Sequence, residues 1–263
     1  MIKIEETEVV GLRHVIRGMR NPMNSWEQSD SGICKGGDDG LGCENCANEV
    51  SCTDSYDHEF KVGKEDYCLM EKLRDAGTDH RKYMRMIVVY LDITAPLYWW
   101  KEFDTYKVGT VTNSCSTMHK IHAKEFTLDD FSHEHLISQW GDPDDNKSFI
   151  FTEYDVPLDP DDEESEEIKF TDADSPLNVL EYSITALNHQ RAAYLVTKDK
   201  KFWWQMIQLL PSSYNQKRTI MLNYEVLANI YKSRRLHKLD EWRIFCAWIE
   251  SLPYSQLITG KVE

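Results

Sequence analysis

Three polar residues in the last fifth of the chain have types and spacing suited to ligand binding. Asn223, Asn229 and Arg234 are separated by six and then five residues. On a helix that turns by about 100° per residue, Asn223 and Arg234 share one face and Asn229 lies about 120° away. The guanidinium fork of arginine donates two parallel hydrogen bonds to a phosphate or an imide carbonyl. The spacing therefore indicates a helix that contacts two ligands, with a polar helix surface as the alternative interpretation.

Four cysteines close together could hold a metal. Cys34, Cys43, Cys46 and Cys52 follow the pattern C-x8-C-x2-C-x5-C, and glycines between the first two ease a tight backbone path. Four thiolates suit a tetrahedral zinc ion and equally suit an iron–sulfur cluster, and His58 could replace one of them. A third alternative is a loop with four reduced thiols. Disulfides are disfavoured because the chain has an odd number of cysteines, seven in total.

The cysteine pattern gives a prediction about metal content. Purified protein is expected to contain about one equivalent of zinc or iron per chain. Elemental analysis checks this, and finding neither metal in protein produced with both supplied would leave the reduced thiols as the better interpretation.

Composition excludes several classes of protein. The 263 residues carry 30 Lys and Arg against 45 Asp and Glu, a net charge of −15, which disfavours binding to a nucleic-acid backbone. Aromatic residues make up 11% of the chain, too many for a disordered protein. The apolar segment MIVVYLDI is too short to span a bilayer, and the first ten residues contain no apolar signal core. We therefore expect a soluble, cytoplasmic protein without a membrane partner.

Local patterns predict the elements that position these residues. A short strand and a helix with Arg13, Arg17 and Arg20 on one face open the chain. The composition then predicts a helix over Lys64–Ala76, a strand over Met84–Thr94 and an aromatic helix in LYWWKEF. The remaining predicted helices span Pro176–Lys198, Lys201–Leu210, Gln216–His237 and Leu239–Ser251.

Two segments interrupt this pattern of elements. Residues at about 29–60 are rich in Gly, Asp and Cys and read as an irregular insertion. Residues at about 141–175 form an acidic loop, with fourteen acidic residues against two lysines between Gly141 and Asp174. We find no internal repeat and no flexible linker, so we predict a single domain over 1–263.

The order of segments resembles the flavin-dependent (alternative) thymidylate synthases over most of the length. The Arg-x-x-Arg of that family is matched by Arg17 and Arg20, and its Ala-Pro pair before an aromatic helix by Ala95-Pro96. Leu210-Pro211 matches the family's late Leu-Pro, and Asn223, Asn229 and Arg234 match its Asn, Asn and Arg without a gap. The resemblance implies an α+β fold with a central, mostly antiparallel sheet and long helices, here with Cys-rich and acidic insertions.

The family signature is degenerate in this chain. The Arg-His-Arg triplet that holds flavin pyrophosphate in the family is replaced by Thr105, Tyr106 and Lys107. With one residue inserted, Asn113 and Ser116 fall on the family's Asn and second Ser, whereas Met118 replaces the signature Arg. Fewer cations remain for phosphate groups, so flavin binding is expected to be weak.

The resemblance also implies a reaction and the residues that serve it. Reduced FAD would drive methyl transfer to C5 of dUMP or a related uracil nucleotide, with NADPH and methylene-tetrahydrofolate as cosubstrates and without a protein nucleophile. Arg234 would polarise the uracil ring, with Ser116 beside it as the second catalytic candidate. The implied nucleotide-binding residues are Glu102, Ser116, Thr117, Lys217, Arg218, Asn223 and Arg234. The implied flavin-binding residues are His80, Tyr106, Lys107, Asn113, Asn229 and His237.

Two other functions stay open on the same scaffold. One is a non-catalytic nucleotide-binding protein, and the other is a scaffold that holds a protein partner through its acidic loop and cysteines. Because the family's sites lie between subunits, the resemblance implies a homotetramer. A flavin absorption band in purified protein would separate the enzyme from these two alternatives.

Overall fold

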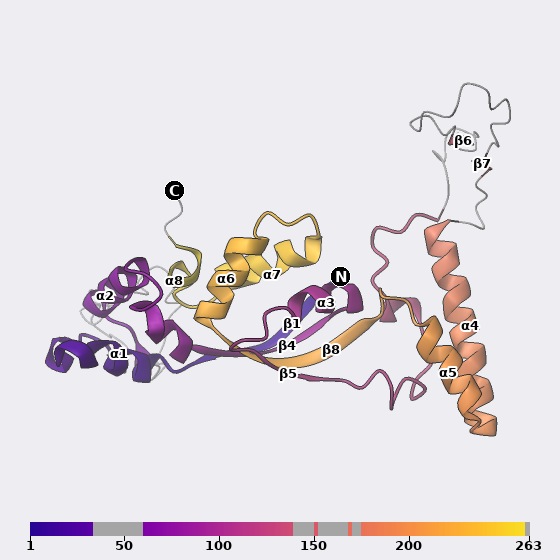
Figure 1. Ribbon diagram of the computed structural model, residues 1–263, viewed down its shortest axis with the longest axis horizontal. Helices are drawn as coiled ribbons and strands as arrows, with labels where there is room; N and C mark the ends of the chain where they lie inside the picture. Colours follow the sequence, from indigo (N-terminus) through magenta and orange to yellow (C-terminus); the bar gives the residue numbers. More distant parts are fainter. Residues whose placement is uncertain (34–59, 139–149, 152–167, 170–174, 261–263) are drawn as a thin grey trace, which may run out of the picture. The chain divides into compact units, whose positions relative to one another are not determined.

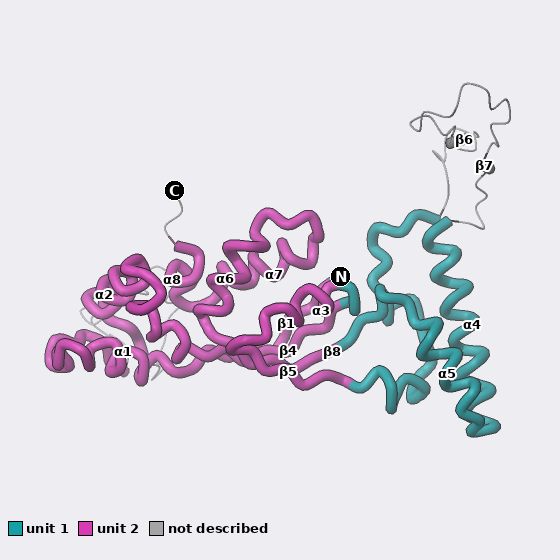
Figure 2. Tube along the Cα trace, in the orientation of Figure 1, with its two compact units in different colours: residues 1, 96–98, 116–216 teal, residues 2–95, 99–115, 217–263 magenta. Residues whose placement is uncertain are grey.

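The computed structural model describes residues 1–33, 60–138, 150–151, 168–169 and 175–260. The chain divides into two compact units, shown in different colours in Figure 2. The smaller unit contains residues 1, 96–98 and 116–216, and the larger unit contains residues 2–95, 99–115 and 217–263. The prediction of a single domain over 1–263 stays a prediction.

A four-stranded sheet with the strand order β1-β4-β8-β5 is the centre of the fold (Figure 1). Strand β1 pairs antiparallel with β4, and β5 pairs antiparallel with β8. The four strands are β1 (Lys3–Val10), β4 (Val88–Pro96), β5 (Val111–Ser114) and β8 (Asn215–Asn223). On β4, Val89, Leu91, Ile93 and Ala95 are buried while the residues between them are less so, which is the period of two expected for a strand.

The larger unit also contains most of the helices. They are α1 (Leu12–Arg20), α2 (Lys64–Asp75), α3 (Leu97–Phe103, whose first two residues count with the smaller unit), α6 (Tyr224–Arg234), α7 (Asp240–Glu250) and α8 (Gln256–Thr259). Short 3-10 segments are η1 (Asn21–Met23), η2 (Trp26–Gln28) and η3 (Arg81–Met86), and β2 (Gly32–Ile33) pairs with β3 (Phe60–Lys61). The mixture of sheet and helices confirms the predicted α+β class.

Helices α3 and α7 contribute an aromatic core to the larger unit. Trp99 is completely buried, and its ring centroid lies 4.9 Å from that of Trp100, 5.0 Å from Phe103 and 4.8 Å from Trp242. Phe245 adds an edge contact to Trp99 at 5.7 Å. Offset and edge-to-face arrangements of this kind stabilise a core beyond the burial of area alone.

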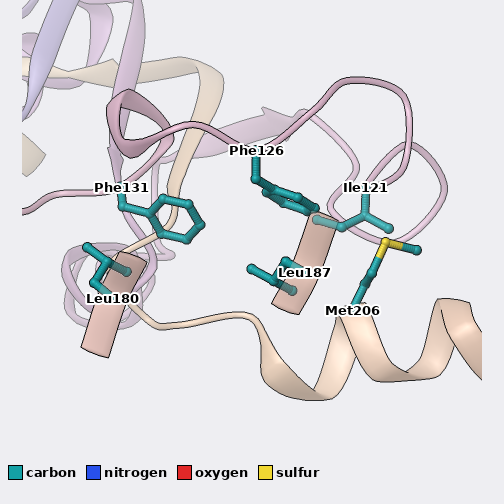
Figure 3. Close-up of a cluster of buried hydrophobic side chains, with 6 residues drawn as sticks. All are labelled: Ile121, Phe126, Phe131, Leu180, Leu187 and Met206. Atoms are coloured by element: carbon teal, nitrogen blue, oxygen red, sulfur yellow. The ribbon is translucent and has the colours of Figure 1, made fainter. Parts of the chain in front are cut away.

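The smaller unit has a hydrophobic core of its own. It is built by α4 (Pro176–Thr197), α5 (Lys200–Leu209) and the segment around η4 (Leu128–Asp130), and it also holds the short strands β6 (Ile150–Phe151) and β7 (Ile168–Lys169). Figure 3 shows the six buried side chains of this core, which are Ile121, Phe126, Phe131, Leu180, Leu187 and Met206. Asn188 of α4 fixes the segment further, because its side chain bonds both the N–H and the C=O of Phe126.

Helix α4 begins at a serine cap whose removal should be measurable. Ser175 is fully buried, and its side chain accepts a hydrogen bond from the backbone N–H of Asn178. Ser175→Ala is expected to lower the free energy of unfolding by about 1 kcal/mol, since one N–H of the first turn loses its acceptor. Urea unfolding checks this, with the partly exposed Ser183→Ala of the same helix as the control; equal losses in both variants would contradict the capping role.

One predicted helix is wrong in its first third. Residues Gln216–Asn223, predicted as the start of a helix that runs to His237, instead belong to strand β8, and the helix is limited to Tyr224–Arg234. The sequence QKRTIMLN buries Gln216, Ile220 and Leu222, an alternation that pairs well within a sheet. Asn223 is therefore the residue before the helix rather than a position inside it.

In the part of the chain that the structure describes, no helix is both long and apolar enough to cross a membrane.

Candidate nucleotide site around Arg234

Five side chains of the larger unit meet at the end of α6, and we call them the Arg234 cluster: Glu102, Tyr106, Arg234, His237 and Trp242. Arg234 donates from Nη1 to Glu102 Oε2 at 2.6 Å and from Nε to the Tyr106 hydroxyl at 3.0 Å. The Trp242 indole N–H donates to the same Glu102 oxygen at 2.9 Å. One carboxylate oxygen thus holds both the guanidinium and the indole in place.

His237 completes the surroundings of that carboxylate. Its Nδ1 accepts a hydrogen bond from the backbone N–H of Leu239 at 3.2 Å, so the proton of the neutral ring sits on Nε2. Nε2 lies 3.6 Å from Glu102 Oε2. Two N–H groups therefore donate to one oxygen and the His237 ring lies near it, while Oε1 of Glu102 has no hydrogen-bond partner among the described residues.

The cluster rests on the aromatic core and opens to solvent. The Arg234 guanidinium lies 4.7 Å from the Trp242 ring, which is itself completely buried. The side chains of Arg234 and Glu102 are 19% and 36% exposed, so a ligand can reach them. In the described chain, Nη2 of Arg234 has no hydrogen-bond partner. The site therefore offers the Arg234 Nη2 as a donor and the Glu102 Oε1 as an acceptor, next to the apolar Trp242 ring. Such a site can bind a planar group that carries both acceptors and donors.

Asn223 and Arg234 lie at opposite ends of α6. The Asn223 side chain accepts a hydrogen bond from the Val226 N–H at 3.0 Å and so caps the helix. Eleven residues of helix separate the two by about 16 Å along the axis. The Asn223 amide also lies against Gly109, where a Cβ would come within 3.0 Å of it and where φ is +81°. This places Asn223 beside the loop after Lys107, and its role in binding stays a prediction.

Lys217 and Arg218 on β8 are already engaged by carboxylates. Lys217 Nζ lies 3.0 Å from Asp92, and that pairing raises the pKa of the lysine. Arg218 Nη1 contacts Asp104 at 2.7 Å, and its guanidinium lies 4.2 Å from the Trp100 ring. A nucleotide phosphate at either residue would therefore have to compete with a carboxylate.

The degenerate signature forms an exposed segment. Lys107, Asn113 and Ser116 are all exposed, and Asn113 lies on the edge strand β5 opposite Thr219. The Ser116 hydroxyl contacts His119 Nδ1 at 3.0 Å and accepts from the His119 N–H at 2.9 Å. These contacts form a local turn, and Thr117 follows within it. Ser116 and Thr117 count with the smaller unit.

The residues predicted for flavin do not meet at one place within the larger unit. Tyr106 and His237 belong to the Arg234 cluster, whereas His80 lines a separate cavity between α1, α2 and η3. Asn229 lines another cavity beside α8. The family resemblance implies sites shared between copies of the chain, so this dispersion leaves the flavin prediction open.

The predicted metal ligands Cys34, Cys43, Cys46 and Cys52 lie outside the described residues. Among the residues that are described, no group of three or more His, Cys, Asp or Glu side chains could hold a metal ion. The zinc or iron–sulfur prediction is therefore untested.

Comparison with family models and curated proteins gives no match, whereas comparison with solved structures gives matches in fold. The flavin-dependent thymidylate synthase ThyX of Helicobacter pylori, complexed with FAD and dUMP, aligns with a TM-score of 0.57 at 14% identity, over 99% of this chain and 100% of that one. PolB of Streptomyces cacaoi, a UMP/dUMP methylase bound with 5-Br dUMP, aligns with a TM-score of 0.51 at 13% identity, over 98% and 95% of the two chains.

These likenesses define the fold. The chain has the α+β architecture that ThyX and PolB share. More particularly, it has the fold of the flavin-dependent thymidylate synthases, as the resemblance in sequence predicted.

One feature of the site was missed from the sequence. The sequence pattern assigns no role to Trp242, yet its indole N–H donates to Glu102 and its ring lies beneath the Arg234 guanidinium. A tryptophan eight residues after an arginine does not by itself predict a contact between the two side chains. The pair Glu102 and Arg234 is separated by 132 residues, so only the fold reveals it.

Proposed function

We propose that the chain binds a uracil nucleotide at the Arg234 cluster and methylates its base at C5. The observation that carries the proposal is the position of the Arg234 guanidinium. Hydrogen bonds to Glu102 and Tyr106 fix it and leave its Nη2 available for a ligand. The ThyX fold supports it, since the neighbours with that fold include a thymidylate synthase with FAD and dUMP and a UMP/dUMP methylase.

Two residues of the Arg234 cluster contact the uracil ring in this proposal, and Tyr106 and Trp242 hold these two in place. Nη2 of Arg234 donates to a uracil carbonyl, and the free Oε1 of Glu102 accepts the imide N–H beside it. As negative charge develops on the base, the fixed guanidinium stabilises it without having to reorganise. The Trp242 indole N–H donates to Glu102 and keeps its carboxylate beside the ligand.

The chemistry of methyl transfer requires groups that this chain does not itself supply. Bound FAD, kept reduced by NADPH, would supply the reducing equivalents, and methylene-tetrahydrofolate the carbon. Candidate flavin contacts are the exposed Lys107, Asn113, Asn229 and His80. Because one chain does not gather them, we propose that they form the flavin site together with other copies in a homotetramer.

An assay of the full chain tests the proposal. Protein incubated with dUMP, FAD, NADPH and methylene-tetrahydrofolate is expected to form dTMP, detected chromatographically, and Arg234→Ala is expected to abolish the product. Calorimetric binding of dUMP without product, under conditions in which a known enzyme turns over, would instead support a non-catalytic nucleotide-binding protein. The single cation in the segment Thr105–Lys107 favours that second candidate.

The flavin part of the proposal yields a separate prediction. Wild-type protein is expected to take up FAD at micromolar levels, and Thr105→Arg to tighten binding roughly tenfold, since one charge-assisted contact is restored. Tyr106 is left unchanged, because its hydroxyl accepts a hydrogen bond from Arg234. Flavin fluorescence measures the affinity, with the exposed Lys101→Arg as the control. No binding to either protein would contradict the flavin site.

A further inference from the structure

The turn between α4 and α5 combines exposed lysines with exposed apolar side chains. The two helices pack against each other, and this turn joins them (Figure 1). Around the turn, the sequence YLVTKDKKFWW contains three lysines, one aspartate and four aromatic residues. In a chain with a net charge of −15, this is a local excess of positive charge. We call its exposed residues the hairpin tip: Leu195, Val196, Lys198, Lys200, Lys201 and Trp204.

Two of the three lysines have no ion-pair partner within the described ranges. Asp199 is the one acidic residue of the turn. Its carboxylate accepts a hydrogen bond from the Lys201 N–H at 2.9 Å and lies 3.3 Å from Lys201 Nζ. The Nζ atoms of Lys198 and Lys200 instead lie 5.8 Å and 5.6 Å from the centres of aromatic rings. A contact with a ring face leaves the ammonium group accessible to an anion.

Lys198 has a backbone conformation that lysine seldom adopts. It ends α4 with φ +56° and ψ +13°, in the left-handed region. Glycine is the usual residue where a helix ends in this way, because it has no Cβ to clash. A lysine makes this turn less stable than a glycine would, so folding alone gives no reason for its presence. Residues held in such a conformation often serve a function.

The apolar side chains of the hairpin tip narrow the class of partner. Val196 is 85% exposed, Trp204 is 42% exposed, and Leu195 is also exposed. Val196 and Leu195 would gain little from a nucleic acid, because such contacts go to phosphates and to bases stacked on aromatic rings. Tryptophan and lysine beside aliphatic side chains are typical of protein surfaces that lie at the interface of a lipid bilayer.

A second copy of the chain is a poorer partner for the hairpin tip. In a contact related by a two-fold axis, the same patch of both copies meets itself. The unpaired ammonium groups of Lys198 and Lys200 would then lie near those of the partner. Burying them without counter-ions costs free energy, whereas an anionic surface supplies the counter-ions.

We propose that the hairpin tip binds the surface of a membrane that contains anionic phospholipid. Lys198 and Lys200 contact the lipid phosphates, and Val196 and Trp204 enter the interfacial layer. The composition predicts no membrane partner because no segment can span a bilayer, and this contact is instead peripheral and limited to the turn. Each unpaired lysine contributes about fivefold to affinity, so binding is reversible and weakens with salt. No residue of the tip belongs to the Arg234 cluster, so the proposal does not depend on the proposed function.

Flotation of the full chain with vesicles tests the proposal. Wild-type protein is expected to float with phosphatidylcholine vesicles that contain about one-third phosphatidylglycerol, and not with phosphatidylcholine alone. The double variant Lys198→Gly/Lys200→Ala is expected to bind the anionic vesicles at least about tenfold more weakly. Glycine suits the left-handed conformation, so the thermal melt of this variant is expected to lie no lower than that of the wild type. The double variant Lys238→Ala/Arg13→Ala removes the same charge from exposed positions of the larger unit and is expected to bind like the wild type.

Four flotation and binding results would overturn the proposal. They are equal binding by the tip variant and the wild type, an equal loss in the control variant, equal flotation with neutral and anionic vesicles, and tighter binding to single-stranded oligothymidylate than to anionic vesicles. Size-exclusion chromatography adds a fifth. Dissociation of an oligomer in the tip variant would place the hairpin tip between copies of the chain and would also overturn the proposal.

Discussion

Replacing Arg234 with alanine is expected to weaken dUMP binding by about 2–4 kcal/mol, or roughly 30- to 900-fold. The variant loses a charged donor above an apolar floor, and it leaves Glu102 with only the Trp242 indole as a close donor. A carboxylate freed in this way would also repel an anionic nucleotide. The two effects act in the same direction, which is why the expected loss is large.

Calorimetric titration with dUMP measures the loss. Arg234→Lys keeps the charge but not the fork, so it is expected to recover only part of the affinity. Lys101→Ala removes a positive charge from the exposed residue next to Glu102 and is expected to bind dUMP like the wild type. Equal heats for wild type and Arg234→Ala would rule out the Arg234 cluster as the nucleotide site.

Elements with a strong local pattern could be predicted from the sequence. Helices α2, α4, α5 and α7 begin and end within one residue of the predicted limits. Proline or glycine near their ends and Ser or Asp caps at the starts of α4 and α5 mark these limits, and they are local signals. The fold class came from the resemblance of the sequence to the flavin-dependent thymidylate synthases.

The start of β8 and the partners of Arg234 could not be predicted in the same way. Residues Gln216–Asn223 contain no helix breaker, and their strand conformation depends on pairing with β4 and β5, which are distant in sequence. The spacing of Asn223 and Arg234 predicted one helix face, whereas Asn223 caps the start of α6 and Arg234 is its last residue. Glu102 contacts Arg234 only because α3 and α6 belong to one packed unit.

The ion pair that Arg20 of α1 forms with Asp66 could not be predicted from the sequence either. The sequence predicts Arg17 and Arg20 on one helix face, and Arg17 is exposed. Arg20 is only 5% exposed, and its Nε donates to Asp66 at 2.6 Å. Asp66 is completely buried and also accepts hydrogen bonds from the hydroxyls of Ser29 and Ser31, each at 2.6 Å. This pair joins α1 to α2 near the start of the chain.

Asp66→Asn is accordingly expected to lower the free energy of unfolding by about 3–5 kcal/mol at neutral pH. Asparagine keeps the shape of the side chain but leaves the Arg20 guanidinium buried without a counter-ion. Urea unfolding measures the loss, and the exposed neighbour Glu65→Gln on the same helix is expected to change stability by less than about 0.5 kcal/mol.

The same pair predicts how this loss depends on pH. Burial alone would raise the pKa of Asp66, but hydrogen bonds from Ser29, Ser31 and Arg20 outweigh it and hold the pKa below its usual value. Because the folded pKa lies below the unfolded value of about 3.9, the ionised carboxylate contributes its full stability above that pH. The contribution is lost as the pH falls through the folded pKa, so the difference between wild type and Asp66→Asn should shrink on acidification below about pH 4. A difference that stays constant through this range would mean that Asp66 does not stabilise the fold as a charged group.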